Sequence, residues 1–74
     1  MSAAELPREP ARAGIVDEFD EHVGLGWISD EEGNRYLFHC VEIADGTRTI
    51  DVGVAVSFSP MYKFGAWEAA DVVQ

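Results

Sequence analysis

The sequence predicts a small all-β protein, a five-stranded antiparallel Greek-key barrel, on three observations. Five short segments are rich in β-branched and aromatic residues, and turn-forming residues separate them. No segment repeats its apolar residues with the period of a long helix. The chain has 74 residues, enough for one domain with a modest core. Closing such a sheet into a barrel also leaves no strand edge exposed.

The first strand is expected to follow a flexible N-terminal tail. Residues 1–12 contain Pro7 and Pro10 and no apolar repeat, so we expect a tail there and a barrel domain over residues 13–74. Residues 13–19 contain a β-branched pair and end on an aromatic residue, which predicts a strand.

The next segment, VGLGWISDEEGNRYLFHC over residues 23–40, predicts a β-hairpin with its turn near residues 31–34. Side chains alternate along a strand, so Leu25 and Trp27 share one face of the first arm. Leu37 shares a face with His39 in the second arm. We therefore expect two pairs of side chains to lie next to each other on one surface.

Two glycines alternate with the first of these pairs. Gly24 and Gly26 occupy the opposite face of the same arm. Glycine inside a strand costs stability unless neighbouring backbone must approach closely. Their placement predicts a tightly curved sheet.

After the hairpin, residues 41–44 are long enough for one 3₁₀ turn, and Asp45-Gly46-Thr47 is a turn signal. Residues 52–58 alternate most clearly, with Val52, Val54, Val56 and Phe58 on one face. This alternation predicts a strand.

The C-terminal part is expected to hold a loop and a last strand. Pro60 is expected to end the preceding strand, because proline cannot donate a ladder hydrogen bond. Residues 61–65 then form a loop, and residues 66–73 a last strand. The predicted core consists of Val16, Ile28, Tyr36, Phe38, Ile43, Ile50, Val54, Val56, Ala70 and Val72.

Two motifs of the hairpin resemble a known family. GLGWI at residues 24–28 and LFH at residues 37–39 resemble the two ribonucleoprotein motifs of the cold-shock domain. Shorter matches precede and follow these motifs, so the resemblance covers roughly residues 13–73. It implies a cold-shock type OB-fold barrel that binds single-stranded RNA or DNA by stacking bases on rings over the first three strands.

The resemblance also assigns positions to the binding surface. The family's contact positions correspond here to Glu18, Phe19, Leu25, Trp27, Leu37, His39, Cys40 and Thr47. Three of them, Phe19, Trp27 and His39, carry rings. The family's usual tryptophan is Glu18 here. The candidate nucleic-acid-binding residues are Phe19, Leu25, Trp27, Leu37 and His39, with Arg48 and Lys63 as phosphate contacts.

The charge of the chain opposes this function. The formal net charge is −9 with only five lysines and arginines, and residues 17–32 hold seven acidic residues and no basic one. Three stacked bases would contribute about 3 to 6 kcal/mol, or a dissociation constant between roughly millimolar and tens of micromolar. Acidic Asp17 and Glu18 beside the rings lower the expected affinity further, so binding should be weak and sensitive to salt.

Structural roles compete with these functional ones. The sequence fits a structural role equally well, with Trp27 and His39 as half-exposed residues of the sheet and Phe19 as a partly buried packing residue. Trp67 has no clear counterpart in the family, so it either caps the barrel or marks a different contact surface. A second function also fits, in which a degenerate barrel has lost nucleic acid and its apolar patch of Leu25, Trp27 and Leu37 contacts a protein.

Other functions find little support. The chain has no dinucleotide fingerprint, no nucleophile elbow and no metal-ligand spacing, so we expect neither an enzyme nor a cofactor or metal. Its single cysteine, Cys40, is expected to be a partly buried apolar residue. The lone cysteine, the lack of a long apolar run and the lack of a signal peptide predict a cytoplasmic protein without a membrane partner.

Overall fold

Five strands and one short 3₁₀ turn are formed by the residues that the computed structural model describes, 9–63 and 65–74. They are β1 (Arg12–Asp20), β2 (Leu25–Asp30), β3 (Arg35–His39), the 3₁₀ turn η1 (Cys40–Glu42), β4 (Ala55–Lys63) and β5 (Ala66–Val73). Residues 1–8 of the expected tail lie outside this part of the chain. The Glu9 N–H donates to the Pro60 carbonyl at 2.8 Å, and Arg12 already belongs to the first strand.

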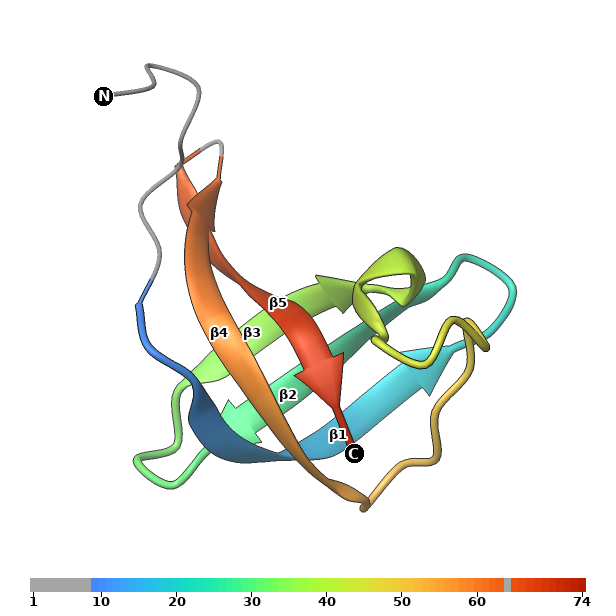
Figure 1. Cartoon of the computed structure of the whole chain (residues 1–74), viewed down its shortest axis with the longest axis horizontal. Coiled ribbons are helices and arrows are strands. Elements are labelled where there is room, and N and C mark those ends of the chain that lie inside the picture. Colours follow the sequence, from blue (N-terminus) through green and yellow to red (C-terminus); the bar gives the residue numbers. More distant parts are fainter. Residues whose placement is uncertain (1–8, 64) are drawn as a thin grey trace.

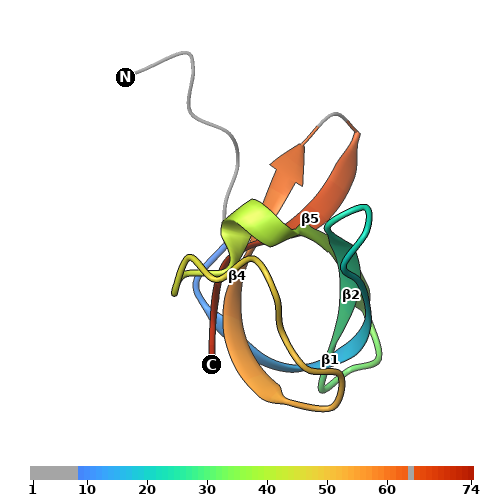
Figure 2. The same cartoon turned by 90° about the vertical axis from the view of Figure 1, so that its right-hand side faces the viewer.

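The strands close into a barrel in the order β1-β2-β3-β5-β4, and β4 pairs back with β1 (Figures 1 and 2). This confirms the predicted five-stranded barrel, with one refinement. Four of the ladders are antiparallel, but β3 and β5 are parallel, with Leu37 opposite Glu68. An odd number of strands in a closed ring cannot alternate in direction throughout, so one parallel pair is unavoidable.

The barrel interior holds the core that the alternation predicts. Nine of the ten predicted residues are buried, and Val54 is half-buried against them. The structure also buries Phe58, Met61 and Ala69. Tyr36 and Phe58 pack with their ring centroids 5.0 Å apart, an arrangement typical of aromatic pairs in cores.

The prediction that Pro60 ends its strand is wrong. β4 continues through Pro60 to Lys63, so residues 61–63 are strand rather than loop. The Pro60 carbonyl accepts a hydrogen bond from Glu9, on the β1 side of β4. Because the N–H and C=O of a strand residue point to the same side, the position of the missing N–H faces away from β5. The β4–β5 ladder therefore loses no hydrogen bond at Pro60.

The same strand begins later than expected. Val52 is 59% exposed in a turn, and β4 starts at Ala55. Gly53 has a φ of +90°, and its N–H donates to the Val16 carbonyl at 2.8 Å. The turn at Gly53 thus replaces the first three residues of the predicted strand. The last strand is confirmed over residues 66–73, with Ala70 and Val72 buried.

The close approach expected at the hairpin glycines is present. A Cβ atom on Gly26 would lie 2.5 Å from the Glu18 carbonyl oxygen and 2.6 Å from a Phe38 ring carbon. A Cβ atom on Gly24 would lie 2.7 Å from the Cys40 Sγ. At Gly26 only the hydrogen of glycine fits between the strands, which lets the sheet curve tightly at this point. Gly24, with a φ of +71°, belongs to the turn that precedes β2.

We therefore expect Gly26→Ala to destabilise the barrel through steric overlap, by about 3 kcal/mol, the upper range for overpacking. Gly33→Ala is the matched control. Gly33 has a φ of +84° but open space around it, so this substitution should cost only about 1 kcal/mol. Urea unfolding of the two variants measures both costs. Equal destabilisation would contradict the tight contact at Gly26.

Candidate nucleic-acid interface

The register of the β2–β3 hairpin brings four candidate residues together on the outside of the barrel. Leu25 lies opposite His39, and Trp27 lies opposite Leu37. The alternate residues of both strands, such as Ile28 and Phe38, are buried. The expected surface of two adjacent pairs is thereby confirmed. We call the group Leu25, Trp27, Leu37 and His39 the platform.

A shallow hollow of about 430 Å³ lies along the β1 side of the platform. Its lining residues are Glu18, Phe19, Asp20, Val23, Leu25, Gly26, Trp27 and Leu37. The volume is within the range of small-ligand sites. Val23 is 65% exposed at its mouth, so the hollow offers an apolar floor with acidic residues on one side.

Phe19 turns to the other face of the sheet. The register of β1 shifts between Val16 and Glu18, which marks a β-bulge. Beyond it, Phe19 pairs with Gly26 and its ring stacks on Phe38, with centroids 5.8 Å apart. The half-buried Phe19 ring therefore supports the platform from inside the barrel. Phe19 also lines part of the hollow beside Trp27.

The same bulge sends acidic side chains outward. Glu18 lies opposite Trp27, and Asp20 lies opposite Leu25. The Asp20 carboxylate accepts hydrogen bonds from the backbone N–H groups of His22 and Val23, at 2.9 and 3.4 Å. It thus holds the β1–β2 connection in its turn.

Arg35 is the residue of this surface that sequence reasoning passed over. Its guanidinium lies over the Trp27 ring, 5.0 Å from the ring centroid. It also pairs with Glu18 at 2.6 Å and with Asp17 at 3.4 Å. The hydrogen bond to Glu18 raises the pKa of Arg35 most strongly, so its positive charge is secure. Ser29 donates a further hydrogen bond to Asp17.

The ion pair of Arg35 is exposed. The side chains of Arg35 and Glu18 are 47% and 66% accessible to solvent. Exposed pairs of this kind contribute about 0 to 1 kcal/mol to stability. The sequence alone does not indicate these neighbours of Arg35, because Asp17 and Glu18 lie in β1, two strands away from β3 in the sheet.

On its other side the platform meets a small charged group. The His39 Nε2 lies 3.5 Å from Glu68 Oε1, and the Lys63 Nζ lies 3.8 Å from the same oxygen. Glu68 is in β5 and pairs with Leu37. Lys63 was expected in a loop, but it ends β4. The structure therefore brings this cation next to the platform.

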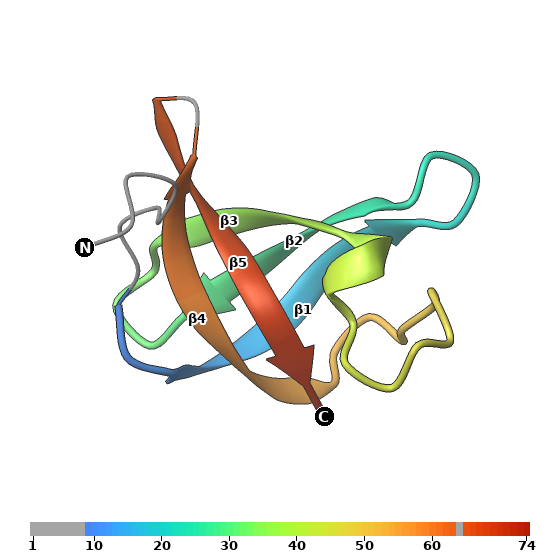
Figure 3. The same ribbon diagram turned by 45° about the horizontal axis from the view of Figure 1, so that its top comes forward.

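Arg48 lies in the long connection between η1 and β4, which is at the same end of the barrel as the connection between β1 and β2 (Figures 1 and 3). Its backbone adopts a φ of +61°, and its side chain is exposed. The neighbouring Thr49 hydroxyl donates to Glu21 at 2.7 Å, which ties this connection to the loop that leads into β2. Arg48 is thus next to the residue that joins this connection to the β1–β2 loop.

The two remaining family positions carry no ring and have local roles. Cys40 is half-buried and packs against the core, as expected. The Thr47 hydroxyl donates to Asp45 at 2.8 Å and stabilises the turn there. The two residues contribute apolar support and turn structure respectively.

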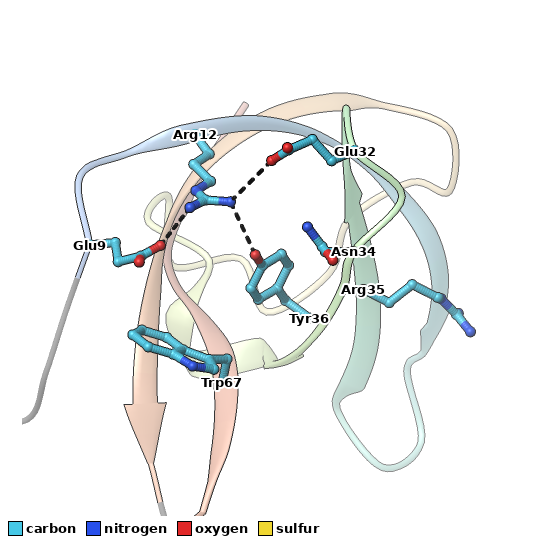
Figure 4. A pocket seen from close by; sticks show the side chains of 7 residues that line it. All are labelled: Glu9, Arg12, Glu32, Asn34, Arg35, Tyr36 and Trp67. Atoms are coloured by element: carbon cyan, nitrogen blue, oxygen red, sulfur yellow. Dashed lines mark hydrogen bonds and ion pairs between the residues drawn. The ribbon is translucent and has the colours of Figure 1, made fainter.

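A second hollow, also about 430 Å³, lies at the end of the barrel near the β2–β3 turn (Figure 4). Trp67 forms one wall, and its ring meets Tyr62 edge-on at a centroid distance of 5.4 Å. Arg12 lies at its rim, with contacts to Glu9 at 2.6 Å and to the Tyr36 hydroxyl at 3.3 Å. Trp67 therefore lines the barrel-end hollow and is not among the residues that line the hollow beside the platform.

Asp30 ties this barrel end together. Its side chain is only 4% exposed and lies 3.2 Å from Arg12. Burial opposes ionisation, but hydrogen bonds from Asn34, the Glu32 N–H and Tyr36 prevail and lower the pKa of Asp30. The same carboxylate caps the hairpin turn by accepting the N–H groups of Glu32 and Asn34, each at 2.9 Å.

Comparisons with known proteins agree with this geometry. A family model described as 'Cold-shock' DNA-binding domain matches residues 12–74. A search of curated proteins found no match. Within residues 9–63 and 65–74, no helix is long and apolar enough to cross a membrane. The same residues contain no group of three or more His, Cys, Asp or Glu side chains arranged to hold a metal ion.

The pKa of Asp30 leads to a pH prediction. A carboxyl group whose pKa is lowered by folding stabilises the native state above its unfolded pKa, near 4, and this contribution disappears as pH falls through the folded pKa. We expect the melting temperature to fall between about pH 5 and about pH 2, and to fall less in Asp30→Asn. Asp51→Asn, at an exposed position, is the control and should keep the slope of the unaltered protein. An equal slope in all three proteins would contradict the role of Asp30.

Proposed function

The chain belongs to the cold-shock DNA-binding domain family, and on that premise we propose that it binds single-stranded RNA or DNA on the platform, with weakened affinity. Domains of this family bind nucleic acid and are not enzymes. The observation that carries the proposal is the outward register of the hairpin, with Leu25 opposite His39 and Trp27 opposite Leu37. Unpaired bases bind proteins by stacking on such exposed side chains.

The weakened affinity follows from what the platform offers. Trp27 and His39 are its two rings, while Phe19 packs inward on Phe38. At the same contribution per base, two stacked bases contribute about 2 to 4 kcal/mol, and the upper end of that range corresponds to a dissociation constant of about 1 mM. Leu25 and Leu37 add apolar contact without a π-face. The proposed contacts to phosphate are Lys63, which lies 3.8 Å from Glu68 beside the platform, and Arg48 in the connection between η1 and β4.

A protein partner is the second candidate function, and one observation favours it. The hollow beside the platform combines exposed Val23 with Leu25, Trp27 and Leu37, and it is bordered by Glu18 and Asp20. An apolar patch with a charged rim is typical of protein contact surfaces. Its acidic rim would select a basic partner. We rank this function second because the family binds nucleic acid.

The first test uses tryptophan fluorescence. The chain has two tryptophans, so Trp67→Phe leaves Trp27 as the only reporter. Oligothymidine or oligouridine added to this variant at low salt should quench the emission, because a stacked base contacts the indole ring directly. The measurement is a titration at high micromolar protein. Absence of any quenching would overturn the proposal and favour the protein partner.

The control for that test is a variant that removes the ring itself. Trp27→Ala should weaken binding by about tenfold or more, which is the loss of one stacked base. Binding to this variant is measured from the heteronuclear NMR shifts of the other platform residues. The barrel should remain folded, since Trp27 is outside the core. Unchanged affinity in Trp27→Ala would place the bases elsewhere on the protein.

A second prediction concerns the phosphate contacts. Each cation that neutralises a phosphate adds about 0.7 to the slope of log affinity against log salt for single strands. We expect Lys63→Gln and Arg48→Gln each to lower this slope by about that amount and to weaken binding equally for different base sequences. Titrations at several salt concentrations measure it. A slope unchanged in both variants would remove these two residues from the interface.

A further inference from the structure

The strongest further feature is a cation that the protein holds against its own carboxylates. Resting on the proposed function, we propose that Arg35 is an additional strand contact, which exchanges Glu18 and Asp17 for a phosphate group when single-stranded nucleic acid binds. In the unbound protein Glu18 and Asp17 neutralise Arg35, and in the complex a phosphate group replaces them. The proposal explains how a chain of net charge −9 keeps a phosphate-binding group at its platform.

The position of Arg35 supports this role. It projects from β3 on the same outer face as Leu37, and its guanidinium carbon lies 5.0 Å from the centre of the Trp27 ring. Figure 4 shows its side chain pointing away from the barrel-end hollow. A base that stacks on Trp27 carries its phosphate at the margin of the ring. Because the guanidinium lies over the Trp27 ring in the unbound protein, a stacking base takes its place there, and the long Arg35 side chain turns to the phosphate at the margin.

The chemistry of the exchange is favourable. A guanidinium has five N–H donors in a planar fork, which fits the oxygens of a phosphate as well as those of a carboxylate. The present partners, Glu18 and Asp17, are held by contacts of 2.6 and 3.4 Å, but Arg35 and Glu18 are largely exposed. Exposed ion pairs are weak, and carboxylates released from them regain water. Little is lost when the phosphate replaces them.

The exchange has a cost that agrees with weak binding. Once Arg35 turns to the strand, Glu18 remains opposite Trp27 as an uncompensated negative charge. It then repels the phosphate that Arg35 has taken. Glu18 thus opposes binding twice, by competing for the guanidinium and by its own charge. Removing the charge of Glu18 should therefore raise affinity, provided that Arg35 is present to use the gain.

A different arrangement gives opposite results. If Arg35 were only a cap that covers the Trp27 ring, a base would have to displace it, and its removal would strengthen binding. If Arg35 were only a structural partner of Glu18 and Asp17, its removal would leave binding unchanged once the fold is intact. The three roles therefore differ in the sign of a single substitution.

The test is a double-mutant cycle in the Trp67→Phe background, titrated with oligothymidine at low salt. Arg35→Gln should weaken binding about threefold to tenfold and lower the salt slope by about 0.7. Glu18→Gln should tighten binding about twofold to fivefold, the release of one exposed ion pair. In the Arg35→Gln background the gain from Glu18→Gln should be smaller, because only the repulsion by the Glu18 charge itself is then removed. Thermal melts check that all variants remain folded.

Glu31→Gln supplies the distant-charge control. Glu31 is exposed in the β2–β3 turn and carries the same charge as Glu18. Its removal should raise affinity only slightly, and equally with and without Arg35. A gain from Glu18→Gln that matches Glu31→Gln in both backgrounds would overturn the exchange. Tighter or unchanged binding by Arg35→Gln would also overturn it.

The two proposals fail in distinguishable ways. If oligothymidine produces no response of Trp27 even in Glu18→Gln, the proposed function fails and the exchange fails with it. If the unaltered platform responds and Trp27→Ala weakens binding in the NMR titration, but Arg35→Gln binds as well as before, only the exchange fails. Both proposals are supported if Arg35→Gln weakens binding by the expected factor of about three to ten and also lowers the salt slope.

Discussion

The packing of the Phe38 ring against the bare backbone of Gly26 is the contact on which the binding surface depends. A Cβ at residue 26 would lie 2.6 Å from that ring and 2.5 Å from the Glu18 carbonyl, so β1, β2 and β3 approach closely only because residue 26 has no side chain. Strands that curve around such a point direct their outer side chains apart. Leu25 and Trp27, on either side of Gly26, therefore stand free of one another on the convex face and border an accessible hollow.

The hairpin could be predicted from the sequence because its information is local. Alternation with a period of two places Leu25, Trp27, Leu37 and His39 on one face as soon as the turn is fixed, and the Asp-Glu-Gly-Asn turn fixes it. The inward direction of Phe19 could not be predicted in this way. The bulge between Val16 and Glu18 adds one residue to β1, and one added residue reverses the faces of those that follow.

Other features escaped prediction because they depend on partners far away in the chain. Proline in a strand is disruptive only if its nitrogen faces a neighbouring ladder, and the direction of Pro60 is known only once Glu9 is seen on the β1 side. Arg35 is similar, because its contacts with Asp17 and Glu18 come from β1 while its own hairpin partner is Ser29. Lys63 near Glu68 depends in turn on the length of β4 beyond Pro60.

The distribution of charge matters more for binding than its sum. At physiological salt the screening length is about 8 Å, and from Trp27, the platform residue of β2 nearest the turn, to Asp30 the strand rises about 10 Å over three residues. The acidic turn at residues 30–32 is therefore largely screened from a ligand on the platform. The carboxylates nearest such a ligand are Glu18, which is paired with Arg35, and Glu68, which lies near Lys63. A third, Asp20, borders the hollow and accepts hydrogen bonds from the backbone N–H groups of His22 and Val23. Since two of these three carboxylates have a cation beside them, the platform repels phosphate less strongly than a net charge of −9 implies.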